Sequence, residues 1–185
     1  MFDSRSRILV VGTSGSGKST LAGKLSRIFG LKDIELDALF WKEGWTQSGL
    51  GEFRDKIAKA MEGPSGYVIH GNYGKVRDLT WAGVDTVIWL DYSRLVVMWR
   101  VLKRTIGRIR TREVLWAGNR ETFRNSFLAR DAIVFWAWKT YRKRKEEYRE
   151  LFSKNPYRIK NCIIFRKPGE AREFMAAQIG AISDR

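Results

Sequence analysis

The chain has 185 residues, of which 44% are hydrophobic and 30% are charged, a balance that is typical of a globular protein with one full core. Its single cysteine, Cys162, excludes an intramolecular disulfide, and no uninterrupted apolar run is long enough to predict a membrane-spanning segment. The formal net charge of +15 predicts attraction to phosphates, whether those of nucleotides, of nucleic acid or of a membrane surface.

The start of the chain predicts a glycine-rich loop between a strand and a helix. Ile8 to Val11 form a continuous apolar run, which is typical of a strand that is buried on both faces. Apolar residues then recur at helical spacing from Leu21 to Phe29. Between them, the sequence GTSGSGKST fits the pattern G-x-x-x-x-G-K-[ST]. This order of elements predicts a phosphate-binding P-loop.

The residue types of this loop suit a nucleoside triphosphate with Mg²⁺, so we expect ATP and Mg²⁺ as cofactors. Glycines allow positive φ and a close approach of backbone N–H groups to phosphate, and the N-terminus of the following helix adds attraction. Lys18 can reach the β- and γ-phosphates, and the Ser19 hydroxyl can hold Mg²⁺. The predicted nucleotide-binding residues are Gly12, Thr13, Ser14, Gly15, Ser16, Gly17, Lys18, Ser19 and Thr20.

Strands and helices are predicted to alternate along the rest of the chain. The further predicted strands are Lys32 to Leu36, Tyr67 to His70, Thr86 to Leu90 and Cys162 to Phe165. The predicted helices are Glu52 to Met61, Arg94 to about Arg110, Thr122 to Phe152 and Glu170 to Ile179. This alternation predicts a parallel sheet with helices on both faces.

The predicted helix that starts at Arg94 carries an apolar stripe and a row of arginines. The stripe is expected to consist of Leu95, Met98, Leu102, Ile106 and Ile109. The arginines of this region are Arg100, Arg104, Arg108, Arg110, Arg112 and Arg120. Arginines on a closing lid can neutralise the charge of a transferring phosphoryl group, and the alternative is a solvated helix face.

Polar residues follow several predicted strands, and ligands of such sheets bind at the carboxyl ends of the strands. Asp37 could orient the attacking hydroxyl of an acceptor and accept its proton, and the alternative is a helix cap. Asp91 could hold Mg²⁺ through water, and the alternative is a turn or cap residue. We expect both to gather near the P-loop.

With these residues in place, the chain resembles the P-loop kinases of the adenylate kinase and shikimate kinase superfamily. It is most similar to the group known as DNA topology modulation proteins (FlaR-like), or adenylate kinase and related kinases. The segments that carry the resemblance are GTSGSGKST (12–20), LDALFWKEGW (36–45), HGNY (70–73), VIWLD (87–91) and MWRVLKR (98–104).

The resemblance implies an α/β P-loop NTPase fold, a three-layer α/β/α sandwich around a five-stranded parallel sheet of order 2-3-1-4-5 with a helical lid. It implies one domain over residues 1–185, with an acceptor-binding insertion at about 37–64 and a lid at about 104–122. The catalytic residues it implies are Lys18, Asp37, Arg104, Arg108 and Arg112. The acceptor-binding residues are Asp37, Trp41, Asn72, Tyr73 and Arg77, and the metal-binding residues are Ser19 and Asp91. Core packing explains Trp41 equally well.

The predicted function is ATP- and Mg²⁺-dependent phosphate transfer to a small-molecule acceptor, as in a nucleotide kinase. We expect a cytoplasmic protein without membrane contact, because no apolar signal region is present. One alternative is a nucleic-acid-binding P-loop protein affecting DNA topology, which the charge and the segment KTYRKRK (139–145) favour; we expect such binding to be weak and non-specific.

The other alternative is an ATP-binding protein without kinase activity, which His70 favours. Relatives usually carry Asp at this position, where an acidic side chain would help to hold the Mg²⁺ shell or a substrate hydroxyl. Its replacement shifts that task to Asp37 or Asp91, or removes catalysis. We interpret His70 as a structural rather than a catalytic residue.

Overall fold

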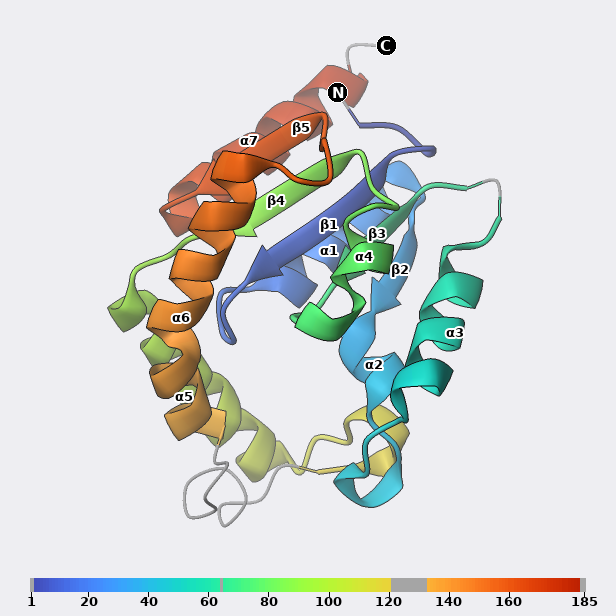
Figure 1. Ribbon diagram of the computed structural model, residues 1–185. Coiled ribbons are helices and arrows are strands. Elements are labelled where there is room, and N and C mark those ends of the chain that lie inside the picture. Colours follow the sequence, from blue (N-terminus) through green and yellow to red (C-terminus); the bar gives the residue numbers. More distant parts are fainter. Residues whose placement is uncertain (1, 64, 121–132, 184–185) are drawn as a thin grey trace.

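Five parallel strands form the centre of the molecule in the computed structural model, which describes residues 2–63, 65–120 and 133–183 (Figure 1). The strands are β1 (Arg7–Gly12), β2 (Lys32–Glu35), β3 (Tyr67–His70), β4 (Thr86–Leu90) and β5 (Asn161–Phe165). Their order across the sheet is β2-β3-β1-β4-β5, which confirms the prediction. β1 therefore lies in the middle, and the loop that follows it opens at the centre of the carboxyl edge.

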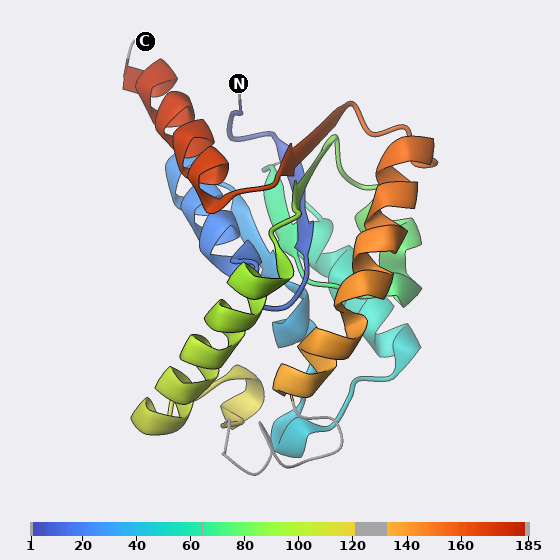
Figure 2. The same ribbon diagram turned by 90° about the vertical axis from the view of Figure 1, so that its left-hand side faces the viewer.

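Helices cover both faces of this sheet. The helices are α1 (Lys18–Phe29), α2 (Leu36–Phe40), α3 (Leu50–Met61), α4 (Arg77–Thr80), α5 (Arg94–Thr111), α6 (Ile133–Lys154) and α7 (Pro168–Ser183). Short 3₁₀ turns are η1 (Glu43–Trp45), η2 (Gly74–Val76) and η3 (Trp116–Gly118). Figure 2 shows α1 and α7 on one side of the sheet and α3, α4 and α6 on the other. The three-layer α/β/α arrangement is therefore confirmed.

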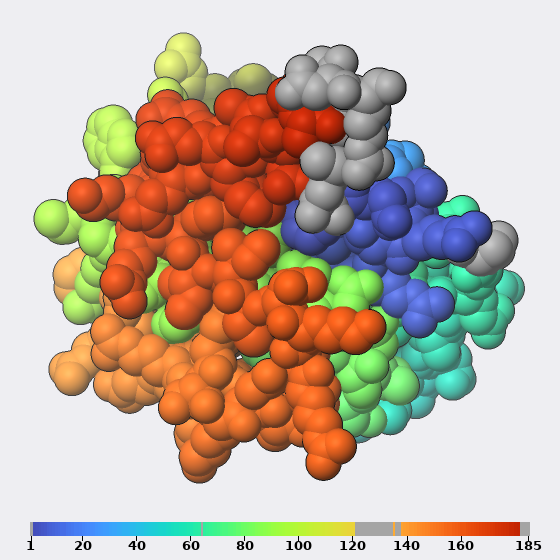
Figure 3. Space-filling model, turned by 90° about the horizontal axis from the view of Figure 1, so that it is seen from above, coloured from blue at the N-terminus to red at the C-terminus, as the bar shows by residue number. Residues whose placement is uncertain are grey.

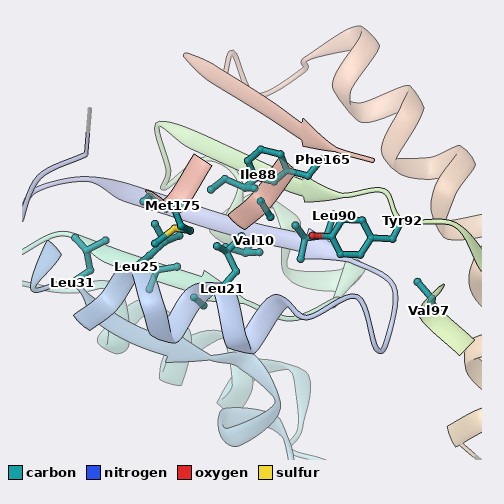
Figure 4. Packing of buried hydrophobic residues seen from close by; sticks show 14 of the residues in the cluster. Val10, Leu21, Leu25, Leu31, Ile88, Leu90, Tyr92, Val97, Phe165 and Met175 are labelled. Carbon is teal, nitrogen blue, oxygen red and sulfur yellow. The ribbon is translucent and has the colours of Figure 1, made fainter. Parts of the chain in front are cut away.

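The core consists of two apolar layers because alternate residues of each strand point to opposite faces. On one face, Val10 and Leu90 of the sheet pack with Leu21 and Leu25 of α1, and Met175 of α7 lies beside them (Figure 4). Each of these side chains is less than 10% exposed. This layer fixes α1, and with it the loop that precedes α1, against the sheet.

The second layer lies between the sheet and α3, α4 and α6. Leu9 and Val11 of β1 belong to it, together with Phe53 of α3, Trp81 after α4 and Tyr148 of α6.

The N-terminal segment lies beside α7, where the Phe2 amide donates a hydrogen bond to the Gln178 side chain at 3.3 Å (Figure 3). Phe2 packs against the first layer, together with Phe174 of α7.

Several element boundaries differ from the predictions. β2 ends at Glu35, because Leu36 and Asp37 already belong to α2. α3 begins at Leu50 rather than at Glu52, and α6 is described only from Ile133, so the predicted helical segment 122–132 lies outside the described residues. None of the helices in the described part of the chain combines the length and the apolar character that crossing a membrane requires.

The predicted apolar stripe of α5 is wrong. The face that packs inward contains Val97, Val101 and Thr105, whereas Leu95 is 81% exposed and Ile106 is 44% exposed. The helix has apolar residues on two sides, and packing against the P-loop selects the side with the compact β-branched residues. A Cβ on Gly15 would lie 2.4 Å from Val101 Cγ2, which shows how close the loop and this side of α5 come.

Candidate nucleotide-binding site

The loop after β1 has the backbone conformation of a phosphate cradle. Gly15 and Gly17 have φ values of +80° and +96°, which L side chains rarely adopt. Gly17 precedes α1 without a side-chain cap, so the first N–H groups of that helix have no side-chain acceptor at this end. Such N–H groups, together with the helix dipole, attract anions.

Lys18 lies inside this loop, and its ammonium group donates a hydrogen bond to the Thr13 carbonyl oxygen at 3.0 Å. Burial lowers the pKa of Lys18 to about 7, and the nearby carboxylates of Asp37 and Glu35 oppose this shift only in part. A phosphate group close to Lys18 would raise its pKa again. The loop is therefore prepared to receive negative charge.

A cavity of about 560 Å³ opens beside the loop. Arg100, Arg104 and Arg108 line one side of it, because they recur every four residues on the face of α5 next to the buried valines. Arg100 Nη1 also donates to the Ser16 carbonyl oxygen at 3.1 Å, which links α5 to the loop. Arg112 ends α5 with a positive φ, is exposed and does not line the cavity, so the structure separates it from the other predicted arginines.

Acidic residues from the junction of β2 and α2 also line this cavity. Asp37 lines it as predicted, and so does Glu35, which sequence reasoning missed. The signal for Glu35 was present in the sequence: it stands two residues before Asp37 at the end of a predicted strand. Tyr73 donates a hydrogen bond to Asp37 Oδ1 at 2.5 Å. Burial, reinforced by Asp37, raises the pKa of Tyr73, so the phenol stays protonated and remains a donor.

Ser19 and His70 meet at the edge of the same cavity. Ser19 Oγ lies 3.3 Å from His70 Nδ1, and His70 Nε2 lies 3.1 Å from Asp33 Oδ1. His70 is 3% exposed, so both of its ring nitrogens have partners in a buried position. Within the described ranges, no three His, Cys, Asp or Glu side chains form a group that could hold a metal ion. An ion bound at Ser19 would therefore not be held by such side chains alone, and phosphate oxygens or water would be among its ligands.

Asp91 does not lie in this site, although the sequence predicts it there. Its side chain is 10% exposed and forms an ion pair with Lys145 at 2.7 Å. It lines a separate cavity together with Trp89 and Arg149. β4 ends beside the P-loop, since Leu90 is paired with Gly12. The ion pair with Lys145 of α6 nevertheless holds the Asp91 carboxylate at the separate cavity.

A second cavity, of about 240 Å³, adjoins the first at Gly71. It is lined by the predicted acceptor residues Asn72, Tyr73 and Arg77, and by cations of α6 that include Arg144. Asn72 Nδ2 donates to the Gly12 carbonyl oxygen at 2.5 Å, which ties the end of β3 to the P-loop. Arg77 pairs with Glu147 at 2.9 Å. The structure thus brings these residues together, although not directly beside the lysine.

Trp41 lies in an aromatic group rather than on either cavity. Its ring stands edge-on to Trp45 at 5.5 Å, and Trp45 in turn lies 6.4 Å from Trp116 of η3. Asn119 strengthens this contact, because its side chain accepts a hydrogen bond from the Trp45 amide at 2.9 Å and donates to the Lys42 carbonyl at 2.8 Å. The segment after α5 is therefore docked on the segment after α2.

Comparison with known proteins supports the fold. No protein-family model and no curated protein sequence matches this chain. It is similar to the solved structure of shikimate kinase from Acinetobacter baumannii in complex with shikimate, with 17% identity, a TM-score of 0.56, and 99% of this chain and 96% of that chain covered. It is also similar to shikimate kinase from Bacteroides thetaiotaomicron, with 15% identity, a TM-score of 0.51, and coverage of 96% and 98%.

A further likeness, to a sugar kinase from Janibacter sp. HTCC2649, covers 54% of this chain and 68% of that chain at 24% identity and a TM-score of 0.39. The two shikimate kinase structures span nearly the whole chain and show that it has a P-loop kinase-like fold. Neither of them supports the narrower DNA topology modulation group.

Proposed function

We propose that this chain is an ATP- and Mg²⁺-dependent phosphotransferase that acts on a small hydroxylated acceptor. One observation carries the proposal: the P-loop lysine, three α5 arginines and the Asp37 carboxylate line the same cavity. Phosphoryl transfer needs little covalent chemistry from a protein, but it needs cations around the phosphates and a group that orients the attacking hydroxyl. Both kinds of group are present in this cavity.

The loop and α5 would hold the triphosphate. Loop N–H groups and Lys18 would bind the β- and γ-phosphates, and Arg104 and Arg108 would neutralise charge on the transferring group. The donor set suits Mg²⁺, because Ser19 and Glu35 offer oxygen atoms along one cavity and phosphate oxygens or water would complete the ligands. Mg²⁺, when bound, would neutralise negative charge on the phosphate oxygens.

Asp37 would bind the acceptor. Tyr73 occupies Oδ1 of this carboxylate, which leaves Oδ2 to accept a hydrogen bond from an acceptor hydroxyl. The hydroxyl oxygen would then attack the γ-phosphorus, the bond between this phosphorus and the bridging oxygen would break, and ADP would leave. The proton of the hydroxyl would pass to Asp37.

The second cavity supports an acceptor with an anionic group. It is lined by the cations Arg77, Lys143 and Arg144, and it adjoins the first cavity at Gly71. A carboxylate or phosphate on the acceptor could pair with these cations while its hydroxyl reaches Asp37. One of the structural neighbours, a shikimate kinase, was solved with shikimate bound. Shikimate therefore belongs in the acceptor panel, together with other hydroxylated carboxylic acids and nucleoside monophosphates.

The test is ADP formation from Mg·ATP in the presence of each acceptor of this panel. We expect one acceptor class to raise ADP formation well above the rate with ATP alone, and Lys18→Ala to abolish the increase. If ATP binds but no acceptor accelerates turnover, the chain is an ATP-binding protein without transfer activity. Lys103→Ala serves as the matched control, because Lys103 is an exposed lysine that lines neither cavity.

A further inference from the structure

Ser19 is the first of three side chains that contact one another in series, and the other two, His70 and Asp33, lie outside the P-loop. Ser19 belongs to the first turn of α1, His70 is the last residue of β3, and Asp33 is the second residue of β2. β2 and β3 are neighbours in the sheet, and the α1 side chain meets the histidine at their carboxyl edge. Three separate elements thus converge on one hydroxyl group.

The Asp33 carboxylate fixes the direction of both hydrogen bonds of the His70 ring. An ionised carboxylate can only accept, so Asp33 Oδ1 requires the proton of this ring to be on Nε2, 3.1 Å away. In a neutral ring Nδ1 is then an acceptor, and the Ser19 hydroxyl, 3.3 Å away, donates to it. The hydroxyl proton is therefore directed at the His70 ring, and the lone pairs of the Ser19 oxygen stay available to other partners in the cavity that both residues line.

This direction matters for a cation. A hydroxyl whose proton is committed to one neighbour keeps its lone pairs for other partners, and a cation needs these lone pairs as ligands. A hydroxyl without such a neighbour can rotate its proton toward the cation, and it must give up that freedom when the cation binds. Groups that orient a metal ligand in this way affect metal affinity even though they do not touch the metal.

We propose that Asp33 and His70 are positioning residues of the Mg²⁺ site, which hold the Ser19 hydroxyl with its lone pairs toward the bound ion; the inference rests on the proposed nucleotide-binding function. Asp33 sets the tautomer of His70, and His70 sets the rotation of the hydroxyl. The pair thus strengthens Mg²⁺ binding without adding a ligand. It gives His70 a use that differs from that of an acidic residue at this position.

The protein contains one histidine, so an ¹⁵N spectrum of its imidazole nitrogens reports on His70 alone. In the free parent protein we expect a proton on Nε2 and none on Nδ1. The Nδ1 signal shifts when Mg²⁺ and a non-hydrolysable ATP analogue are added, because the hydroxyl bonded to it becomes a metal ligand. A proton on Nδ1 in the free parent protein would overturn the proposed chain of hydrogen bonds.

Calorimetry tests the effect on Mg²⁺. The affinity for the same analogue is measured with and without Mg²⁺ in the parent, Asp33→Asn and His70→Phe. We expect both variants to lose about tenfold in Mg²⁺ affinity while their Mg²⁺-free affinity for the analogue stays at the parental value. His70→Asn keeps an acceptor oxygen near Ser19, so we expect it to retain more Mg²⁺ affinity than His70→Phe. Asp55→Asn is the control, since Asp55 is an exposed carboxylate on α3.

The measurements distinguish a failure of the proposed nucleotide-binding function from a failure of the proposed role of Asp33 and His70. If the parent protein does not bind the analogue, the proposed nucleotide-binding function fails and this inference with it. If the parent binds and Asp33→Asn keeps the full Mg²⁺ affinity, only the role of the Asp33–His70 pair is refuted. Asp33 is 39% exposed, so its variant should fold even where His70→Phe does not, and Asp33→Asn then decides the question.

Discussion

Tyr73 Oη donates a hydrogen bond to Asp37 Oδ1 over 2.5 Å, and this contact joins the segment after β3 to the first turn of α2. It fixes one oxygen of a carboxylate that lines the P-loop cavity and leaves the other oxygen for a ligand. The ring of Tyr73 is itself held by Phe40 and Phe53, whose ring centroids lie 4.7 and 5.0 Å away. An aromatic cluster thus sets the orientation of a carboxylate.

Tyr73→Phe should lower turnover with the acceptor about tenfold, because it removes a hydrogen bond to a charged group and retains the packing of the ring. ATP affinity should stay at the parental value, since Tyr73 does not line the P-loop cavity. Steady-state kinetics with the acceptor and calorimetry with an ATP analogue measure the two quantities. A large loss of ATP affinity would show that the contact supports the loop itself.

Nucleotide binding should be coupled to proton uptake by Lys18. Its pKa is about 7 in the free protein, so Lys18 is mostly neutral at pH 8 and becomes protonated when phosphates arrive. At pH 6 it is already charged, and uptake by this group vanishes. Calorimetry in buffers of different ionisation enthalpy measures the uptake, and Lys18→Met supplies the baseline. Equal uptake by parent and variant at pH 8 would contradict the assignment.

The same depressed pKa affects the stability of the free protein. Between pH 7 and 10.5 the unfolded chain holds a proton on Lys18 that the folded protein lacks, so the contribution of Lys18 to stability rises with pH in this window. Lys18→Met should therefore stabilise the ligand-free protein most at pH 7 and below, and less as the pH approaches 10. Thermal unfolding of both proteins across this range measures the difference. A gain in stability that does not change with pH would contradict a lowered pKa of Lys18 in the folded protein.

Arg104→Ala and Arg108→Ala should each reduce turnover by about 10²-fold, the usual loss for one group that stabilises transition-state charge. Arg112→Ala should have a much smaller effect, since Arg112 is exposed and does not line the cavity. The three variants are compared by kcat at saturating ATP. A comparable loss for Arg112→Ala would indicate that the segment after α5 closes over the bound nucleotide.

Any nucleic-acid binding should be weak and should fall steeply with salt, because it would depend on phosphate contacts. The segment 139–145 is not uniformly free for such contacts. Lys139, Arg142 and Lys143 are exposed, whereas Lys145 is paired with Asp91. Replacing the three exposed cations by Gln should abolish binding to labelled single-stranded DNA in a titration at low salt and leave affinity for an ATP analogue unchanged. Sequence-specific binding at physiological salt would contradict this expectation.

The strands were predictable because buried parallel strands produce continuous apolar runs, and the P-loop pattern occurs in a fixed strand–helix context. Their order across the sheet was implied by the resemblance to P-loop kinases. The inward face of α5 was not predictable from periodicity, since apolar residues lie on two of its sides and the contact between Val101 and Gly15 decides between them. Asp91 follows a strand as a metal ligand would, but a lysine more than fifty positions later in the chain captures it. The contact of Ser19 with His70 likewise joins separate elements, which no local pattern reports.

The Asp37→Asn variant tests the central claim most directly. The amide keeps the shape of the side chain but cannot accept the proton of an attacking hydroxyl. Turnover with the active acceptor and affinity for an ATP analogue are measured on the same preparation, after circular dichroism has shown that the variant is folded. The proposed mechanism predicts that turnover falls by about 10²-fold or more while the affinity stays near the parental value. Unchanged turnover in a folded variant would contradict it.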